Sequence, residues 1–316
     1  MTLREVPLPE GISSSAVHKT ITDSQKAKLS RRRRLEIQRL KSSCREAATD
    51  GDDDGDGDTG DSCGVHGAVS VMGRRREMED AVSVEKGFYG KYDYFGVYDG
   101  HGGSNVAEEC RNRMHAIVRE EVERGDTWRK KKGSGFDEDD DGGIDWEMVM
   151  GKCFERMDEE VGEKGNCGNN NNKVEEMTVG STVVVAIVGR EEVVVANCGD
   201  SRAVICRNGD YYLKPYVSSM PEVTISKRTE ADEFIILASD GLWDVISNEV
   251  ACQVVRRCLS GRIKSQEIFN QISKISNNRA EVAAVLLTEL AMAKGSKDNI
   301  SVIVVELKKF RRFGCS

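Results

Sequence analysis

Aspartates at the ends of apolar segments are the residues of this 316-residue chain whose type and placement could do chemistry. Asp99 ends "FGVYD", Asp200 follows "VVVANCG", Asp240 follows "FIILAS", and Asp298 lies in the turn "GSKDN" before "ISVIVV". One such acid is usually a turn residue. Several acids that converge would concentrate negative charge at a cost. Hard divalent cations, Mg²⁺ or Mn²⁺, would compensate it, because the ligands are oxygens without Cys or His clusters.

Two hard cations a few ångströms apart would suit phosphoryl chemistry. Glu79 and Asp80 add two carboxylates, and Gly100 lets a backbone carbonyl approach a metal. Arg75 could grip phosphate oxygens in fork geometry, and His101 could protonate a leaving oxygen. The sequence holds no P-loop and no kinase catalytic loop, so nucleotide-driven transfer is disfavoured.

Several of these side chains also have a purely structural interpretation. His101 could cap a helix that begins near Ser104. Arg75 has an arginine on either side, and the three could form a solvated basic cluster. Asp200 could simply pair with Arg202. Both interpretations stay open at this point for each residue.

Apolar strands and amphipathic helices must bring the acids together. Strands are expected in "AVSVMG", "YDYFGVYDG", "TVVVAIVG", "EEVVVANCG", "SRAVICRNG", "EFIILASDG" and "ISVIVVEL", and helices over 104–125, 146–161, 248–259 and 280–294. Trp243 is expected in the core, and Asp244 either caps the helix that follows or takes part in catalysis. Runs of strands with helices grouped between them indicate an α+β domain with sheets inside and helices outside.

Composition excludes several classes of protein. The net charge is −8, which disfavours a general nucleic-acid-binding surface. No apolar run approaches membrane-spanning length, and the first residues have no apolar signal core. The ten cysteines are scattered singly. We therefore expect a soluble protein of a reducing compartment with free thiols, and no nucleic-acid or membrane partner.

Residues 1–63 are expected to be a tail. Lys26–Lys41 is strongly basic and is either a nuclear localisation patch or a solvated basic helix. Asp50–Asp61 is an acidic low-complexity run whose aspartates match the ligand spacing of a calcium-binding EF-hand loop. Its last position carries Asp61 instead of the usual glutamate, and the segment after it is typical of a strand. Repeated Asp-Gly also produces such a match by accident.

Six motifs resemble, in order, those of the metal-dependent protein phosphatase 2C family. They are "RREMED", "FGVYDGHGG", "GSTVVV", "NCGDSRAV", "FIILASDGLWDV" and "GSKDNISV", and the resemblance covers Gly67–Leu307. "YFGVYDGHGGSNVAEECRNRMH", "YLKPYV" and the basic tail also resemble the plant clade that restrains abscisic-acid signalling. The resemblance implies a β-sandwich of mainly antiparallel sheets flanked by helices, with a binuclear Mn/Mg centre between the sheets.

The family's ligand roles carry over to matching positions of this sequence. Asp99 would bridge the two metals, and the Gly100 carbonyl would bind one of them. Asp240 and Asp298 would complete the other metal. Three further acids would act less directly, through metal-bound waters or at a looser third metal; these are Glu79, Asp80 and Asp200. His101 is then the candidate general acid and Arg75 the phosphate clamp.

The chain departs from the family after "CRNG". In the family, several tens of residues separate that turn from "GD-YLKPYV", whereas here Gly209 is followed at once by Asp210. The absent part includes sheet strands, a flap over the substrate groove and the tryptophan that many clade members insert into the hormone-bound receptor. We therefore expect a catalytic domain over residues 64–309 with an internal deletion near 208–210, and a tail over 310–316.

The junction itself predicts a short hairpin. Asn208-Gly209 is a strong signal for a type I′ turn, because both residues tolerate positive φ. Tyr211–Leu213 is expected to pair with Ala203–Cys206, and Pro215 limits the pairing. So short a substitute would leave a sheet edge open, and the fold is expected to be fragile.

Three functions follow as expectations. The first is a Mn/Mg-dependent protein serine/threonine phosphatase that hydrolyses phosphoserine and phosphothreonine with metal-activated water, as a negative regulator of abscisic-acid signalling in nucleus and cytoplasm. The second is a weak or inactive form that binds kinases or other partners. The third and most remote is a calcium-binding module that uses Asp50–Asp61. The clade resemblance implies stress-activated kinases as substrates, with binding to abscisic-acid receptors weakened or lost.

Overall fold

The computed structural model describes residues 64–131, 143–166, 179–208, 210–212, 221–262 and 278–307. The expected tail over 1–63, with its basic patch and the EF-hand-like run Asp50–Asp61, and the tail over 310–316 lie outside these residues. No helix in the described part of the chain is long and apolar enough to cross a membrane.

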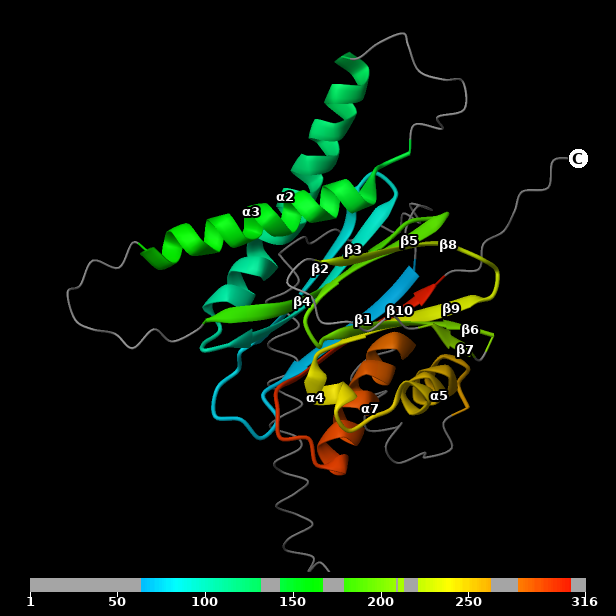
Figure 1. Ribbon diagram of the computed structural model, residues 1–316. Helices are drawn as coiled ribbons and strands as arrows, with labels where there is room; N and C mark the ends of the chain where they lie inside the picture. The colour runs from blue at the N-terminus through cyan, green and yellow to red at the C-terminus, as the bar shows by residue number, and fades with distance from the viewer. Residues whose placement is uncertain are drawn as a thin grey trace, which may run out of the picture. The chain divides into compact units, whose positions relative to one another are not determined.

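Two five-stranded sheets stack face to face (Figure 1). The first has the order β1 (Gly64–Val71), β10 (Ile300–Leu307), β9 (Asp232–Ala238), β6 (Arg202–Arg207) and β7 (Asp210–Tyr212). The second has the order β2 (Asp80–Tyr89), β3 (Tyr92–His101), β4 (Gly180–Val188), β5 (Glu192–Cys198) and β8 (Glu222–Lys227). The strand pairings recorded in both sheets are antiparallel, as the sequence predicts.

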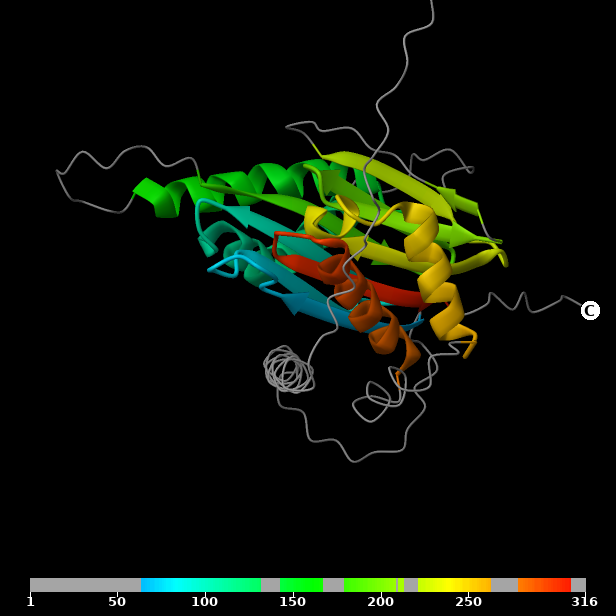
Figure 2. The same cartoon turned by 90° about the horizontal axis from the view of Figure 1, so that it is seen from below.

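Helices cover the outer face of each sheet (Figures 1 and 2). The pair α2 (Asn105–Lys131) and α3 (Trp146–Asn166) lies on the second sheet, and α5 (Asn248–Leu259) with α7 (Arg279–Lys294) lies on the first. The short α4 (Asp240–Trp243) follows β9. The expected bounds of α5 are confirmed, and those of α7 differ by one residue. The expected fold class is confirmed.

β3 explains why the central strands are so apolar. Its Phe95 and Val97 pack between the sheets, whereas Tyr94 and Tyr98 pack toward α2 and α3. Successive side chains of a strand point to opposite faces, so a strand covered on both faces needs apolar residues at nearly every position. Two strands were not expected, β2 and β8. β8 is an edge strand whose Ile225 is exposed, and its sequence lacks such a run.

The predicted hairpin at Asn208-Gly209 is present, and the described residues pair as expected. Asn208 has φ 44°, in the left-handed region that a type I′ turn requires. Tyr211 pairs with Cys206 and Tyr212 pairs with Ile205, both within the expected Ala203–Cys206, and the pairing extends to Arg207 with Asp210. A two-residue loop closes the strands directly across the turn, which fixes this register. Leu213 lies outside the described residues.

Candidate metal centre

Asp80 and Asp99 face each other across neighbouring strands. Asp80 is the first residue of β2, Asp99 is the third residue from the end of β3, and the two are direct partners in the antiparallel pairing. Directly opposed residues bring their side chains within about 5 Å when they lie on one face. The neighbouring strands β2 and β3 therefore each supply one acid to the same place.

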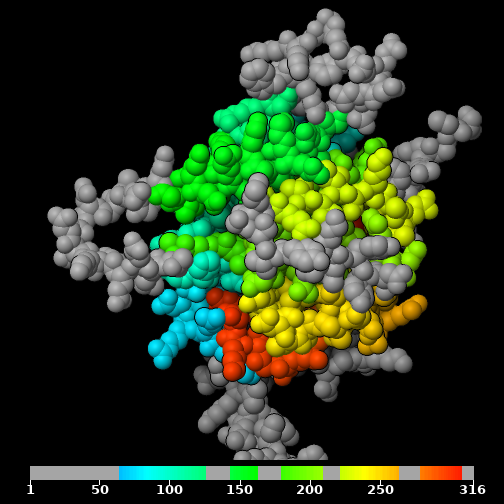
Figure 3. All heavy atoms as spheres, in the orientation of Figure 1, coloured from blue at the N-terminus to red at the C-terminus, as the bar shows by residue number. Residues whose placement is uncertain are grey.

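Three further acids approach from the connections at this end of the sandwich. Asp240 is the first residue of α4, which follows β9. Asp298 lies two residues before the start of β10, and Asp200 lies between β5 and β6. One carboxylate oxygen from each of Asp99, Asp200 and Asp240 lies within 4.8 Å of the other two. Figure 1 shows α4 beside the turn that leads into β10, and in Figure 3 the blue, red and yellow parts of the chain adjoin there. We call Asp80, Asp99, Asp200, Asp240 and Asp298 the acidic cluster.

Burial and mutual repulsion raise the pKa of three acids of the cluster, Asp80, Asp99 and Asp240. Burial, followed by the charges of Asp80, Asp240 and the other acids, raises the pKa of Asp99 from 3.8 to about 9. Burial is also the largest cause that raises the pKa of Asp80 and of Asp240 to about 6. A buried carboxylate without a compensating positive charge is costly, so the neutral form is favoured.

The oxygens of the acidic cluster fit a hard divalent cation. Oδ1 of Asp80 and Oδ1 of Asp240 are buried and have no hydrogen-bond partner among the described residues. Buried polar atoms in folded proteins nearly always have a partner. These two oxygens, which lie beside other carboxylates, therefore indicate that a positively charged partner binds there. Oxygen-only donors of this kind suit Mg²⁺ and Mn²⁺.

A serine chain that sequence reasoning missed fixes the other oxygen of Asp80. Ser239 Oγ donates to Asp80 Oδ2 at 2.9 Å, and Ser239 Oγ accepts from the backbone N–H of Ser301 at 3.1 Å. Ser301 Oγ in turn lies 2.5 Å from Ser70 Oγ. Ser239 stands beside Asp240 in "ASDG", which was the only available signal. These bonds orient Asp80 so that its Oδ1 is left for a cation or for water bound to one.

Arg75 is drawn into the site by an acid. Its Nη2 donates to Asp298 Oδ2 at 2.6 Å, while 53% of the side chain stays exposed. This ion pair favours the clamp interpretation over a merely solvated basic cluster, since the guanidinium stands at the acidic cluster with a face open to a ligand. The hydrogen bond with Asp298, followed by that acid's charge, raises the pKa of Arg75, which keeps it cationic.

His101 is the exposed last residue of β3 and lies opposite Gly180 of β4. A Cβ on Gly180 would lie 2.6 Å from the imidazole Nε2, so the glycine leaves the space that the ring uses. The helix that follows begins only at Asn105, where the Ser104 carbonyl accepts from the N–H of Glu108 at 2.9 Å. Nothing in these contacts assigns His101 to helix capping.

Gly100 and Glu79 meet through their backbones. The Gly100 N–H donates to the Glu79 carbonyl at 3.1 Å, and a Cβ on Gly100 would lie 2.6 Å from that oxygen. The close approach needs glycine at this position. It brings the loop before β2 to the end of β3, with both residues at the acidic cluster.

Local contacts bear on two remaining alternatives, the pairing of Asp200 with Arg202 and the capping of the next helix by Asp244. Arg202 Nη1 donates to Asn248 Oδ1 at 3.2 Å, and its guanidinium lies 5.5 Å from the centre of the Trp243 ring. Trp243 is buried, as expected, with Nε1 donating to the Ala238 carbonyl. Ser247, and not Asp244, caps α5. Asp244 is exposed, and its charge helps raise the pKa of Asp240.

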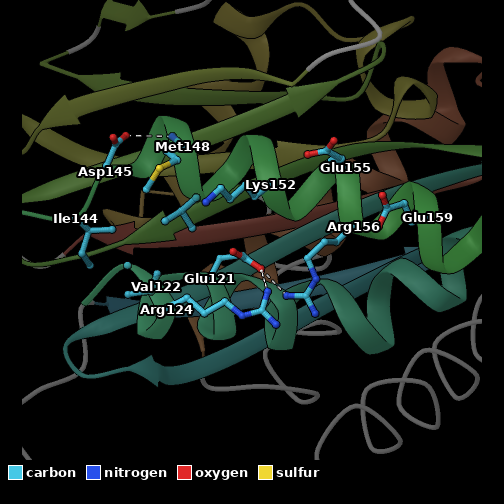
Figure 4. A pocket seen from close by; sticks show the side chains of 12 residues that line it. Glu121, Val122, Arg124, Ile144, Asp145, Met148, Lys152, Glu155, Arg156 and Glu159 are labelled. Carbon is cyan, nitrogen blue, oxygen red and sulfur yellow. Dashed lines mark hydrogen bonds and ion pairs between the residues drawn. The ribbon is translucent and has the colours of Figure 1, made fainter. Parts of the chain in front are cut away.

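A separate pocket of about 650 Å³ lies between α2 and α3 (Figure 4). Its buried acid, Glu121, is paired with Arg124 at 2.7 Å and with Arg156 at 2.6 Å. None of the acidic cluster lines this pocket. Glu121 is therefore neutralised by two arginines, and none of the residues that line this pocket has a buried side-chain atom without a partner among those found in the described part of the chain.

The raised pKa values predict how pH acts on the metal-free protein. A carboxyl group whose pKa rises on folding from 3.8 to about 9 stabilises the fold fully below pH 4 and loses that contribution as pH rises through 9. We therefore expect the melting temperature in chelator to fall between pH 5 and pH 8. Mn²⁺ should raise the melting temperature more at pH 8 than at pH 5, and the rise at pH 8 should be about 5 °C or more.

Calorimetry at both pH values, with and without Mn²⁺, checks this expectation. Asp99→Asn should flatten the dependence in chelator, because the most strongly shifted group is then gone. A metal-free melting temperature that rises from pH 5 to pH 8 would contradict the electrostatics described for the cluster.

Comparisons with known proteins agree with this geometry. The family model described as Protein phosphatase 2C matches residues 64–212 and 208–300. The rice "Probable protein phosphatase 2C 8" is 44% identical over 318 positions, which cover 79% of this chain and 76% of that protein. The Arabidopsis thaliana "Probable protein phosphatase 2C 24" is 40% identical over 302 positions, covering 77% of this chain and 79% of that protein. In fold, the chain is similar to the Mycobacterium tuberculosis serine/threonine phosphatase, with TM-score 0.53 and 17% identity over 77% of this chain and 97% of that one.

Proposed function

The chain belongs to the protein phosphatase 2C family, and from this we propose that it is a Mn²⁺- or Mg²⁺-dependent protein serine/threonine phosphatase. One observation carries the proposal: acids from both sheets place their oxygens together, and Oδ1 of Asp80 and of Asp240 lack partners among the described residues. Such a site can hold two hard cations, with a weaker third beside the exposed Asp200.

The chain's own residues would divide the work as follows. Asp99, Asp240 and Asp298, with the Gly100 carbonyl, would hold the cations directly, and Glu79 and Asp80 would hold them through water. When bound, the cations supply an activated water and neutralise the charge of the phosphate. Arg75 would turn its exposed guanidinium to the phosphate oxygens, since a guanidinium binds two of them at once.

His101 would give its proton to the serine or threonine oxygen that leaves. An alkoxide is a poor leaving group, so a positioned acid lowers the barrier by transferring a proton as the P–O bond breaks. His101 is exposed at the end of β3, two residues after Asp99. It is therefore accessible to a protein substrate while being tied to the strand that carries the central acid.

Replacement of His101 by alanine tests that role through the leaving group. We expect His101→Ala to slow hydrolysis of a phosphothreonine peptide about a hundredfold. The rate of hydrolysis of an aryl phosphate with an acidic phenol should fall only a few-fold, because its leaving group needs no proton. Steady-state rates on both substrates make the comparison, and equal losses on both would remove His101 from the role of general acid.

The assay of purified protein is the direct test of the proposed activity. Release of phosphate from a phosphothreonine peptide should require Mn²⁺ or Mg²⁺ and stop in chelator. Binding of phosphoproteins without turnover would favour the second candidate, a weak or inactive form that acts by binding partners.

We infer an internal deletion, which favours keeping that second candidate. The family model matches in two stretches that meet at β7, and the alignment with the rice protein spans 318 positions while it uses only 79% of this chain. Both facts support a segment present in relatives and absent after Asn208. A variant with the segment restored should melt at a higher temperature and aggregate less, because the three-residue β7 covers little of the sheet edge. Equal melting and aggregation would refute the fragility.

The regulatory setting is proposed from the clade-like motifs of the sequence. We propose that the protein acts in nucleus and cytoplasm as a negative regulator of abscisic-acid signalling, with phosphorylated stress-activated kinases as substrates. The support is "YFGVYDGHGGSNVAEECRNRMH", "YLKPYV" and the basic tail.

This form should resist hormone-dependent inhibition by abscisic-acid receptors. The three tryptophans, Trp128, Trp146 and Trp243, match other positions than the receptor-contacting one. Buried aromatic anchors carry much of the energy of an interface, so affinity should fall by about a hundredfold or more. Inhibition assays with and without hormone measure this affinity for the present chain and for the restored-segment variant. Equal hormone-dependent inhibition of both forms would overturn the idea.

A further inference from the structure

The buried side chain of Asn299 ties together the loop between β1 and β2. Asn299 Nδ2 donates to the carbonyls of Met72, at 2.9 Å, and Glu77, at 3.0 Å. Its Oδ1 accepts from the N–H of Glu79 at 2.8 Å. The side chain is 4% exposed, so water offers no substitute for these bonds. One amide thus uses both donors and an acceptor on the two ends of a single loop.

That loop, Met72–Glu79, carries Arg75. Its own backbone gives little support, because the residues at its tip are exposed and the Arg75 N–H reaches the Met72 carbonyl only at 3.3 Å. Gly73 has φ 63°, and a Cβ there would lie 2.1 Å from the carbonyl oxygen of Asp298. The loop therefore lies directly against the turn that contains Asn299, and the amide is the contact that fastens both of its ends.

We propose that Asn299 is a positioning residue, which holds Met72–Glu79 so that Arg75 can reach the phosphate of the substrate. The proposal rests on the phosphatase function proposed above. It assigns to Asn299 a part in substrate binding that is exerted through Arg75. The neighbouring Asp298 acts at the cations and also pairs with Arg75, so the two adjacent residues would have different tasks.

A double-mutant cycle tests whether Asn299 acts through Arg75. With Arg75 present, Asn299→Ala should lower kcat/KM for a phosphothreonine peptide about tenfold, mainly by raising KM. In an Arg75→Ala background the same change should cost less than about threefold, because the group that it positions is already gone. Equal factors in the two backgrounds would overturn the proposal, as would a loss confined to kcat or traced by calorimetry to weaker Mn²⁺ binding.

Amide hydrogen exchange gives an answer that does not need activity. Asn299→Ala should speed exchange in the peptide that contains Glu79, since Oδ1 of Asn299 accepts from that N–H. Unchanged exchange there would overturn the proposal. If the wild-type chain shows no metal-dependent turnover, the proposed function is wrong, and exchange alone then decides whether Asn299 holds the loop.

Asn278 provides a matched control. Its Oδ1 accepts from the N–H of Ala280 and of Glu281, and its Nδ2 donates to the carbonyl of His66. Asn278→Ala therefore also removes three contacts to backbone groups, but at the start of α7. It should lower the melting temperature, because α7 loses its cap, and leave KM and the Glu79 exchange unchanged. Should Asn299→Ala fail to fold, Asn299→Ser takes its place, and a KM effect as large in Asn278→Ala would overturn the proposal.

Discussion

Asp99→Asn is expected to lower kcat/KM by about a thousandfold or more and, at the same time, to stabilise the metal-free protein. Activity falls because Asp99 stands where both cations would be held, and an amide is a poorer ligand than a carboxylate. Stability rises because the mutation removes the group whose pKa burial and neighbouring acids raise to about 9. Opposite signs of the two effects are typical of a residue kept for function at a cost in stability.

Kinetics with Mn²⁺ and calorimetry in chelator at pH 8 measure the two effects. Asp158→Asn is the control, because Asp158 is an exposed acid of α3 outside the acidic cluster and changes the net charge equally. It should leave both quantities nearly unchanged. If Asp99→Asn kept activity within a few-fold of wild type, the metal centre would be wrongly assigned. Asp240→Ala is expected to abolish activity for the same reason.

Gly241→Ala is expected to disable the site by pushing two of its segments apart. A Cβ at Gly241 would lie 1.9 Å from the carbonyl oxygen of Asn299, so α4 or the turn before β10 must move. Those two segments carry Asp240 and Asp298. We expect a loss of about 3 kcal/mol in the free energy of unfolding and, from displaced ligands, a loss of about a hundredfold in Mn²⁺ affinity.

Gly151→Ala is the matched control for this change. Gly151 lies within α3, and a Cβ there would meet nothing within 4 Å. That substitution should raise stability by about 0.5–1 kcal/mol, because alanine favours a helix more than glycine does. Denaturation measures the free energy of unfolding of both variants, and metal titration measures their Mn²⁺ affinity. A Gly241→Ala protein with wild-type stability and metal affinity would show that the contact can relax freely.

Sequence alone predicted the ends of strands and the acids at those ends, because both depend on short-range patterns. The apolar run that ends at Asp99 is long enough to be unmistakable, and Asn208-Gly209 specifies its own turn. The bounds of α5 were likewise predicted, although Ser247 and not the expected Asp244 caps it.

The supporting contacts were not predictable in the same way. Ser239 bonds to Asp80 across 159 positions of sequence, and Asn299 bonds to Glu79 across 220. No local pattern relates such residues, since an ordinary turn also contains serine and asparagine. The edge strand β8 was missed because it lacks the apolar run that identifies a buried strand.

β6 separates two ends of the molecule. Asp200 precedes β6 at the acidic cluster, whereas the turn at Asn208 follows it at the opposite end. Six residues of strand span about 20 Å. A change of length at the distal turn therefore leaves the acids on their strands, and the chemistry at one end of β6 is separated from the loop length at the other.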